Sequence, residues 1–333
     1  MPPKPLEPGD PLRLGRFELL ARLGEGGQGV VYLGRSTTAG EEKVAVKVLR
    51  SGVDALALQR LARELDAVHK VEPFVTARVI EAAAEGDRRY MVSEFIDGPS
   101  LQERVDALGP LPEGELRRLA VGTAAALTAI HGAGVVHRDF KPANVLLGHD
   151  GPRVVDFGIA RLTDHVSITS GIIGTPAYIS PEQLAGRRPT SAVDMFAWAG
   201  TVIFAASGRS AFAAGSVPAV MHRVLYGEPD LSAVPAALLP LLRQCLDKDP
   251  LRRPGARDVL LCLLDPAARS SGVTRTGPRV SRAAAVSEYP AGAGPARAAA
   301  VAQPGNEFLP GGGEDVEIER SNWHRTTLGG GGL

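Results

Sequence analysis

The chain has few of the residues that mark several classes of protein. It has only two cysteines, Cys245 and Cys262, and no Cys/His set with the spacing of a zinc site. This count excludes a disulfide framework. Both thiols fall in apolar stretches of the sequence, so we expect them to be buried, which suits the reducing cytosol.

A long apolar run is also absent. No stretch approaches the roughly 20 apolar residues of a membrane-spanning helix. The N-terminal sequence MPPKPLEPGD lacks the apolar centre of a signal peptide. We therefore expect no membrane segment and a soluble, cytoplasmic protein.

Net charge is missing as well. The 37 Lys and Arg residues balance the 37 Asp and Glu residues, which argues against a broad attraction to nucleic acid or to a membrane surface. What the chain does have is length and apolar content, with 333 residues of which 44% are hydrophobic. That is enough for roughly two domains, or for one large bilobal domain with additional chain.

The texture of the sequence changes along the chain. Short apolar or β-branched runs, separated by glycine and charge clusters, predict strands at 17–20, 30–33, 44–49, 75–80 and 90–95. A mixed segment at helical spacing, 55–69, lies among them. After Gly98 the pattern predicts helices at 116–133, 191–206, 217–226, 238–246 and 256–264. A small strand-rich part thus precedes a larger helical part.

The two ends of the chain differ from its middle. Residues 1–16 are rich in proline, and we expect a loosely ordered N-terminal extension there. Residues 265–333 are rich in Ala, Gly, Pro and Arg with almost no periodicity, basic first and acidic later. Such a segment buries too little apolar area to offset its ordering entropy, so we expect a disordered tail. A docking or self-phosphorylation segment is the alternative for this tail.

A glycine-rich run, GEGGQGVV, carries Gly24, Gly26 and Gly29. The spacing also occurs in the dinucleotide-binding fingerprint, but that motif needs a helix after the last glycine. The residues that follow here, VVYL, favour a strand, so a hairpin whose backbone N–H groups approach phosphates fits better, with Val31 over an adenine ring. Taken alone, the motif leaves an ordinary glycine-rich turn open.

Lys47 ends the apolar run VAVK. A lysine on an apolar strand is costly to bury unless its ammonium is paired. One interpretation is a surface lysine in water. The other has Lys47 holding phosphates while it pairs with a carboxylate of the following helical segment. Glu64 is the best candidate for that carboxylate by context, ahead of Asp66 and Glu72.

The strongest signal is HRDFKPAN at residues 137–144, followed by DFG at 156–158. Phosphoryl transfer needs a carboxylate that orients a hydroxyl and takes its proton, and Asp139 is placed for this. It also needs hard oxygen ligands for Mg²⁺, which Asn144 and Asp156 offer, while Lys141 can steady the transferring group. Each residue alone could be ordinary, but the joint pattern is not accidental.

Together these motifs resemble the eukaryotic-like Ser/Thr protein kinases of bacteria. The motifs GEGGQGVV, VAVK, HRDFKPAN, DFG, GTPAYISPE and DPLRRP occur in the family's order, from Phe17 to about Leu264. The resemblance implies a kinase domain at 17–264 with an α+β bilobal fold. Its β-rich N-lobe would cover about 17–95 and its helical C-lobe about 97–264. The chain would transfer the γ-phosphoryl group of ATP, with Mg²⁺ or Mn²⁺, to Ser/Thr hydroxyls of proteins.

The resemblance also implies further site residues. Thr175 would contact Asp139 and Lys141, which favours serine/threonine over tyrosine substrates. Ser93 would guard a pocket behind the adenine, and a small residue there predicts that bulky N6-substituted ATP analogues are accepted. The adenine ring would lie between the side chains of Leu23, Val31, Ala45 and Leu146. The backbone of Glu94 and Ile96 would bind its edge.

Regulation follows from the same resemblance. Arg138, next to the catalytic aspartate, implies a phosphorylated activation loop, since a phosphate there would pair with the guanidinium. In the loop 161–173 we favour Thr169, then Ser167, as the modified residue. The chain would then phosphorylate itself, between two copies in a dimer. Glu182 and Arg253 should form a structural ion pair in the C-lobe.

Three other functions compete with this interpretation. A pseudokinase, binding ATP or acting as a scaffold without turnover, would need a missing catalytic part, and none is missing. A small-molecule phosphotransferase conflicts with the HRD, DFG and SPE segments taken together. A protein that acts only by interaction through its tail stays open, because the tail carries no readable motif.

Overall fold

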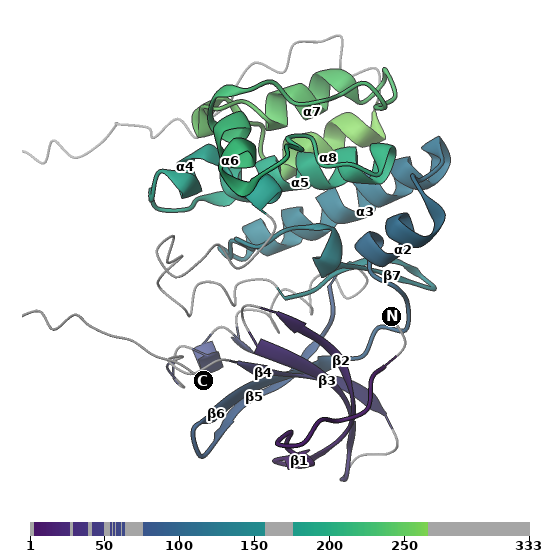
Figure 1. Ribbon diagram of the computed structural model, residues 1–333, viewed down its shortest axis with the longest axis vertical. Helices are drawn as coiled ribbons and strands as arrows, with labels where there is room; N and C mark the ends of the chain where they lie inside the picture. Colours follow the sequence, from purple (N-terminus) through teal and green to yellow (C-terminus); the bar gives the residue numbers. More distant parts are fainter. Residues whose placement is uncertain are drawn as a thin grey trace, which may run out of the picture. The chain divides into compact units, whose positions relative to one another are not determined.

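The computed structural model describes residues 3–26, 29–38, 42–49, 54, 56, 58–60, 62–63, 76–156 and 176–265. Most of the helical segment expected at 55–69 falls outside these residues, as does the tail from residue 266. Strands β1 to β6 form one group, and the helices from α2 onward form another together with the short strands β7 and β8 (Figure 1). This is the α+β, bilobal arrangement that the motifs imply.

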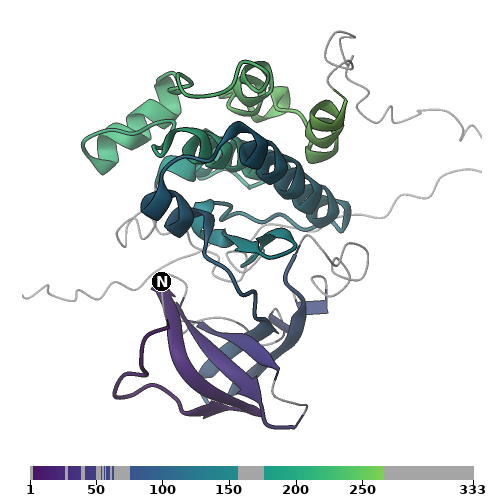
Figure 2. The same cartoon turned by 90° about the vertical axis from the view of Figure 1, so that its right-hand side faces the viewer.

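A single antiparallel sheet forms the N-lobe. Its strand order is β1-β2-β3-β4-β6-β5, and the strands curl around one another instead of lying flat (Figure 2). Alternate residues of the strands point to one face, where Phe17, Leu19, Tyr32, Val46 and Tyr90 are buried. The strands are β1 Arg13–Leu14, β2 Phe17–Gly26, β3 Gly29–Ser36, β4 Lys43–Leu49, β5 Val79–Glu85 and β6 Arg88–Glu94.

The glycine-rich run lies at the ends of β2 and β3, and the last residue of β2, Gly26, pairs with the first residue of β3, Gly29. This confirms a hairpin and excludes the helix that a dinucleotide fingerprint needs. Gly29 has φ +151°, and a Cβ there would meet the carbonyl oxygen of Val48 at 1.9 Å. Only glycine fits, because β4 approaches the backbone so closely.

Two expectations for the first part of the chain were wrong, one for a strand and one for the N-terminal segment. The fourth predicted strand, 75–80, begins instead at Val79, because the backbone before it pairs with another strand: Thr76 bridges Val154. The N-terminal segment was expected to be loose, yet β1 pairs with β2 and Leu14 is 1% exposed. Its backbone hydrogen bonds and apolar contacts offset the entropy that a free segment would keep.

Helix α5 lies in the core of the C-lobe, and its residues from Val193 to Ala205 are all buried. Helix α3 packs on α5 and α8, and Trp198 of α5 donates to Thr123 of α3 at 2.9 Å. The helices are α2 Leu101–Leu108, α3 Glu113–Gly132, α4 Pro181–Leu184, α5 Ser191–Ser207, α6 Val217–Tyr226, α7 Leu239–Cys245 and α8 Ala256–Leu264. The five predicted helices after Gly98 are therefore present, within a few residues of their expected ends.

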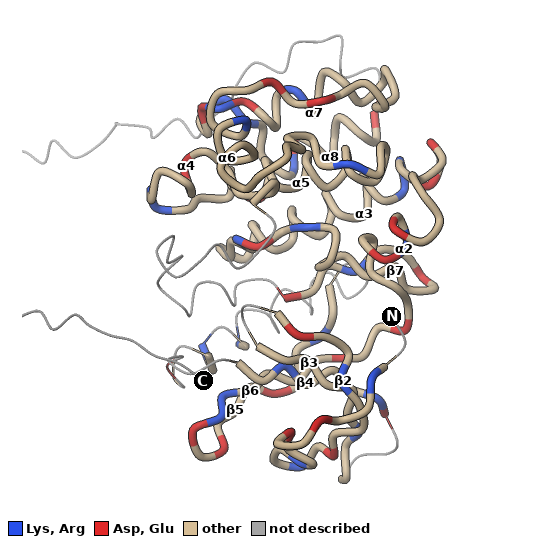
Figure 3. Tube along the Cα trace, in the orientation of Figure 1, with Lys and Arg blue, Asp and Glu red and all other residues tan. Residues whose placement is uncertain are grey.

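Both cysteines lie in this lobe. Cys245 is buried, as expected, and burial raises the pKa of its thiol. Cys262 is only half-buried. Lys, Arg, Asp and Glu are spread over the sheet and the helices without gathering on one element (Figure 3). Among the described residues, no helix combines the length and the apolar content needed to cross a bilayer.

Candidate active site

Lys47 and Asp156 form an ion pair that joins the sheet to the helical part. Lys47 lies on β4 with a side chain only 10% exposed, and its Nζ is 3.0 Å from the Asp156 carboxylate. Asp156 follows β8 (Gly151–Val154), which forms a two-stranded hairpin with β7 (Val145–Gly148). The buried lysine is thus paired, as its apolar surroundings require. Glu64, the partner expected from the sequence, lies outside the described residues.

A second cluster forms around Asp139. Lys141 donates to both carboxylate oxygens of Asp139, at 2.9 and 2.7 Å. The amide nitrogen of Asn144 donates to the Asp139 carbonyl at 2.7 Å and to its carboxylate at 3.3 Å. The structure therefore brings two sequence-predicted residues, Lys141 and Asn144, to the carboxylate of a third, Asp139, whose side chain is 29% exposed. That exposure leaves the carboxylate within reach of a hydroxyl from outside.

The two clusters are tied together by the backbone. Asn144 ends the short turn Pro142–Asn144, and its carbonyl accepts from the N–H of Val155 at 3.0 Å. This bond places Asn144 beside the residue that precedes Asp156. The amide oxygen of Asn144 and the carboxylate of Asp156 are consequently available on adjacent segments, and both are hard oxygen donors.

Backbone strain marks the same region. Arg138 and Asp156 have φ values of 68° and 63°, the left-handed conformation that residues with a Cβ seldom adopt. Within the described ranges, these are the two non-glycine residues with positive φ. Such strain persists only where surrounding contacts impose it, and it gathers at functional sites. One strained residue precedes Asp139 and the other is the proposed metal ligand.

Asp194, a residue that the sequence did not single out, supplies contacts that hold Arg138 in this conformation. Its fully buried carboxylate accepts hydrogen bonds from the main-chain N–H groups of His137 and Arg138, each at 2.8 Å. It also lies 2.8 Å from Nε2 of His131 on α3. A single carboxylate near the start of α5, an otherwise apolar helix, was the available signal. Asp194 anchors the loop that carries Asp139.

His137 is part of this anchor. Its ring is completely buried, stands edge-on to Phe140 with the ring centroids 5.4 Å apart, and accepts from the N–H of Asp139 at 3.3 Å. Burial lowers the pKa of His137. A neutral imidazole can therefore accept this bond and help to fix the start of the loop that carries Asp139.

The residues expected around an adenine lie on neighbouring strands. Val31 is the cross-strand partner of Lys47, and Ala45 that of Ser93. Leu23 is the extra residue in a β-bulge of β2, between paired neighbours. The side chains of Leu23, Val31, Ala45 and Ser93 are half-buried, whereas that of Lys47 is buried. The sheet thus brings these four residues, which are expected around an adenine, close together beside the buried Lys47.

The segment after β6 completes this arrangement. Glu94 ends β6, and Ile96, which is 9% exposed, lies so close to β7 that a Cβ on Gly148 would meet its side chain at 3.2 Å. Leu146 of β7 is bridged to Ser100. Ile96 and Leu146, far apart in the sequence, therefore lie in neighbouring segments.

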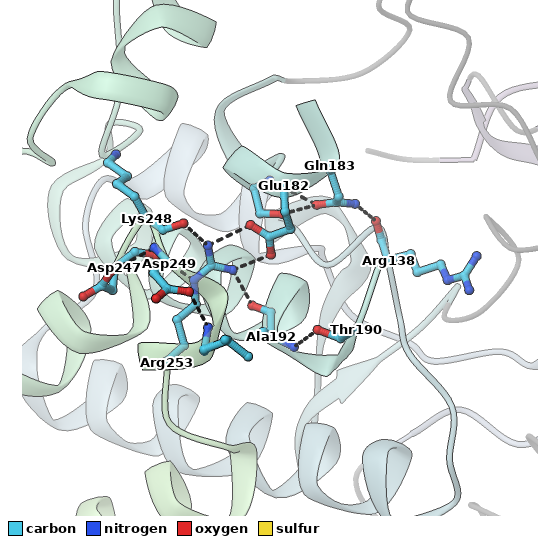
Figure 4. Close-up of polar contacts among 11 residues, drawn as sticks. Arg138, Glu182, Gln183, Thr190, Ala192, Asp247, Lys248, Asp249 and Arg253 are labelled. Atoms are coloured by element: carbon cyan, nitrogen blue, oxygen red, sulfur yellow. Dashed lines mark hydrogen bonds and ion pairs between the residues drawn. The ribbon is translucent and has the colours of Figure 1, made fainter. Parts of the chain in front are cut away.

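The predicted ion pair of the C-lobe is confirmed. Arg253 contacts both carboxylate oxygens of Glu182, at 2.6 and 2.8 Å, and also donates to the carbonyl of Ala192 (Figure 4). The neighbour of Glu182, Gln183, donates to the carbonyl of Arg138 at 3.3 Å. Helix α4 is thereby linked to the catalytic loop on one side and to Arg253 on the other.

Four predicted site residues lie outside the described residues: Glu64, Ser167, Thr169 and Thr175. The described geometry nevertheless brings the Asp139 and Asp156 carboxylates, two lysines and the side-chain amide of Asn144 into one region. Such a set can neutralise a polyphosphate and activate a hydroxyl.

Comparison with known proteins adds independent findings. A sequence model of the family described as "Protein kinase domain" matches residues 17–262. The chain is 43% identical over 261 residues to the probable serine/threonine-protein kinase PkwA of Thermomonospora curvata, covering 77% of this chain and 35% of that protein. It is 41% identical over 255 residues to the serine/threonine-protein kinase AfsK of Streptomyces coelicolor, covering 75% and 32%. The chain thus spans about a third of the length of these relatives.

A solved structure shares the fold. The crystal structure of Rad53 1-466 in complex with AMP-PNP matches with a TM-score of 0.62 over 74% of this chain and 64% of that one. The sequence identity is 23%, so this likeness bears on the fold alone.

Proposed function

Because the chain belongs to the protein kinase domain family, we propose that it is an ATP-dependent protein kinase that phosphorylates serine and threonine hydroxyls. The observation that carries the proposal is the Lys47–Asp156 ion pair, 3.0 Å long. It joins a phosphate-binding lysine of one lobe to a metal-ligating carboxylate of the other. The relatives named as serine/threonine kinases support the substrate class.

Asp139 is the catalytic base in this proposal. It orients the acceptor hydroxyl and takes its proton as the oxygen attacks the γ-phosphorus, while the bond from that phosphorus to the bridging oxygen breaks and ADP leaves. Lys141, which pairs with Asp139 at 2.7 Å, lies close enough to stabilise the negative charge of the transferring group. The hydrogen bonds from Asn144 hold the carboxylate in place. Asp194 fixes the backbone beneath all three residues.

Lys47 holds the α- and β-phosphates. Its ammonium is largely shielded from water. In such surroundings its attraction to phosphate is stronger than in bulk solvent. Glu64 would share the ammonium from the helical segment. The glycine-rich hairpin, with Gly24, Gly26 and Gly29, would approach the phosphates through its backbone N–H groups.

The oxygen donors fit Mg²⁺, with Mn²⁺ as its substitute. Asn144 uses its amide nitrogen for Asp139, so the amide oxygen is the atom that a cation would take. Asp156 contributes its carboxylate from the adjacent segment. When bound, the cation supplies charge neutralisation for the triphosphate.

The adenine would lie against half-buried side chains of both lobes. Ala45 and Ser93 are cross-strand partners, so the small Ser93 leaves room beyond Ala45 for a substituent on the base. The remaining contacts come from the residues assigned above, namely Leu23, Val31, Glu94, Ile96 and Leu146.

Thr175, Thr169 and Ser167 carry the finer part of the proposal. Thr175 would select serine and threonine acceptors beside Asp139. Phosphate on Thr169 or Ser167 would pair with Arg138 and order the activation loop. The chain would add this phosphate itself, between two copies, and would then act on other proteins in the cytoplasm.

Incorporation of labelled γ-phosphate from Mg-ATP tests the function. Wild type should label a generic protein acceptor and its own Thr169 or Ser167, found by mass spectrometry, while Asp139→Asn should label neither. Asp87→Asn makes the same chemical change in the exposed turn between β5 and β6 and should behave as wild type. If wild type binds ATP but transfers no label, the chain is a pseudokinase and the proposal fails.

A further inference from the structure

The N-terminal segment lies along the edge of β2 opposite β3. Lys4 and Arg22 exchange two backbone hydrogen bonds of 2.8 Å, and the N–H of Leu19 donates to the carbonyl of Leu12 at 2.9 Å. Leu14 is buried in the core of the sheet, and Leu6 packs against that core. These contacts fix the segment between Lys4 and Leu14 to the strand that leads into the glycine-rich hairpin.

Asp10 lies at the centre of this segment, with a side chain 5% exposed. Its carboxylate accepts from Nε and Nη2 of Arg22, both at 2.7 Å, and from the hydroxyl of Tyr32 at 2.7 Å. The N–H of Glu7 donates to it at 2.7 Å as well. Four hydrogen bonds thus converge on one shielded carboxylate, which satisfies the acceptor capacity of its two oxygens.

The two side chains that Asp10 binds belong to opposite arms of the hairpin. Arg22 is on β2, Tyr32 is on β3, and the two residues are cross-strand partners. The next paired residue of β2 is Gly24, opposite Val31. Asp10 therefore ties the arms together at the last pair before the glycine-rich run.

The ladder is irregular at this point. A β-bulge interrupts the pairing between Arg22 and Gly24, and a bulge disrupts the local hydrogen bonds and increases the twist. Side-chain contacts consequently contribute more to the spacing of the arms here than in a regular ladder. Arg22 extends the contact network into the hairpin, since its Nη1 lies 3.4 Å from the carboxylate of Glu25 and 2.8 Å from that of Glu7.

We propose that Asp10 is a positioning residue for nucleotide binding, which sets the spacing of the two arms of the glycine-rich hairpin. The role rests on the ATP-dependent function proposed above. Asp10 lies outside residues 17–262, where the family match falls, so no general property of the family assigns it. It acts through Arg22 and Tyr32 and touches neither phosphate nor acceptor.

Removing the charge of Asp10 leaves the Arg22 guanidinium without its bidentate partner and the Tyr32 hydroxyl without a charged acceptor. The arms then lose their shared tie, and the backbone N–H groups of the hairpin spend less time in the geometry that suits phosphates. Binding of ATP should weaken, while proton transfer at Asp139, in the other lobe, should continue. The expected signature is a rise in KM for ATP with little change in kcat.

The test compares wild type with Asp10→Asn, Tyr32→Phe and the control Glu18→Gln. Glu18 pairs with Arg35 at 2.8 Å across the same two strands, far from the glycines and exposed to solvent. We measure KM for Mg-ATP and kcat on a generic protein acceptor, and amide hydrogen exchange of residues 22–32 without nucleotide. Asp10→Asn should raise KM about three- to tenfold with kcat within about twofold, Tyr32→Phe should raise KM less, and Glu18→Gln should leave KM unchanged.

Hydrogen exchange at 22–32 should be faster in Asp10→Asn than in wild type and unchanged in Glu18→Gln. If Asp10→Asn does not fold, Tyr32→Phe carries the same comparison. An unchanged KM in the folded variants, an equal rise in the control, or unchanged exchange would overturn the inference. A wild type without any turnover would instead refute the proposed function, and the exchange measurement would still decide whether Asp10 holds the hairpin.

Discussion

Arg253 holds the carboxylate of Glu182 through two hydrogen bonds, although the two residues are 71 positions apart, and their side chains are 0% and 5% exposed. The same guanidinium donates to the carbonyls of Ala192 and Asp247, at 2.9 and 2.8 Å. One buried cation thus connects the start of α4, the start of α5 and the turn before α8.

Replacement of Arg253 by lysine should therefore destabilise the protein. An ammonium cannot make the two parallel bonds, and Glu182 would be left partly unpaired in the interior, so we expect a loss of about 3 kcal/mol in the free energy of unfolding. Urea unfolding followed by circular dichroism measures this. Arg252→Lys is the control, because Arg252 is 70% exposed and reaches carboxylates only at 3.9 Å. Equal losses in both variants would contradict the prediction.

Asp194→Asn should impair chemistry more than nucleotide binding. The carboxylate accepts from the N–H groups of His137 and Arg138, and an amide of the same shape keeps one acceptor oxygen instead of two. The loop that carries Asp139 would shift, and a shift of this kind can lower kcat by about ten- to a hundredfold. Steady-state kinetics should show KM for ATP nearly unchanged. Asp258→Asn, in the first turn of α8, should match wild type, and a larger effect on KM than on kcat would refute the idea.

Ser93→Met should close the space beyond the adenine. Ser93 is the cross-strand partner of Ala45, and a longer side chain there would meet a bulky N6 substituent while leaving ATP itself accepted. The ratio of kcat/KM for N6-benzyl-ATP to that for ATP should fall by about tenfold or more. Ser93→Ala keeps the small size and should preserve the ratio. If methionine changes nothing, residues 90–96 do not line the base as proposed.

The contribution of Asp10 to stability should depend on pH. The Arg22 guanidinium beside Asp10 holds the pKa of that carboxyl well below its usual range, so the folded state favours the ionised form. This stabilisation is complete above the unfolded-state pKa of about 4 and is lost as the pH falls toward the lower folded-state value. The difference in unfolding free energy between wild type and Asp10→Asn should be constant from pH 5 to 7 and shrink below about pH 4. A difference that grows on acidification would contradict the assignment.

The pKa of Tyr32, whose hydroxyl donates to the Asp10 carboxylate, is shifted in the opposite direction. Burial and the Asp10 carboxylate raise the pKa of Tyr32 to about 12. Its hydroxyl therefore stays protonated at every pH where the protein is handled, and it donates to Asp10 throughout. Tyr32 consequently contributes nothing to the pH dependence near pH 4.

The residues proposed to carry the chemistry could be predicted more readily than the residues that hold them in place. The sequence singles out Asp139, Lys141, Asn144 and Asp156 because the proposed phosphoryl transfer requires these residue types at this spacing, and their roles stay a prediction. Helix α6 could be found because its apolar positions recur at helical spacing over Val217–Tyr226. Each of these patterns lies within a short stretch of the chain, so it can be recognised without knowing which distant segments meet in the fold.

What the sequence did not predict depends on contacts between distant segments. Asp194 reaches a loop 56 and 57 residues away, and nothing near it in the chain indicates that distance. The proline-rich composition of the N-terminal segment predicts a loose chain, yet the segment makes backbone hydrogen bonds to β2 and buries Leu14 in the core of the sheet. Strand β5 was misplaced because the residues before Val79 pair with a strand much later in the chain.

The pairing of β1 with β2 makes β1, not β2, the outer strand of the sheet. A chain shortened to begin at Phe17, where the family match starts, would lose this cover. The backbone donors and acceptors of β2 would then face water as an open strand edge, beside a core no longer closed by Leu14. Open edges pair with other chains, so such a shortened protein should self-associate and precipitate even though every catalytic residue is still present.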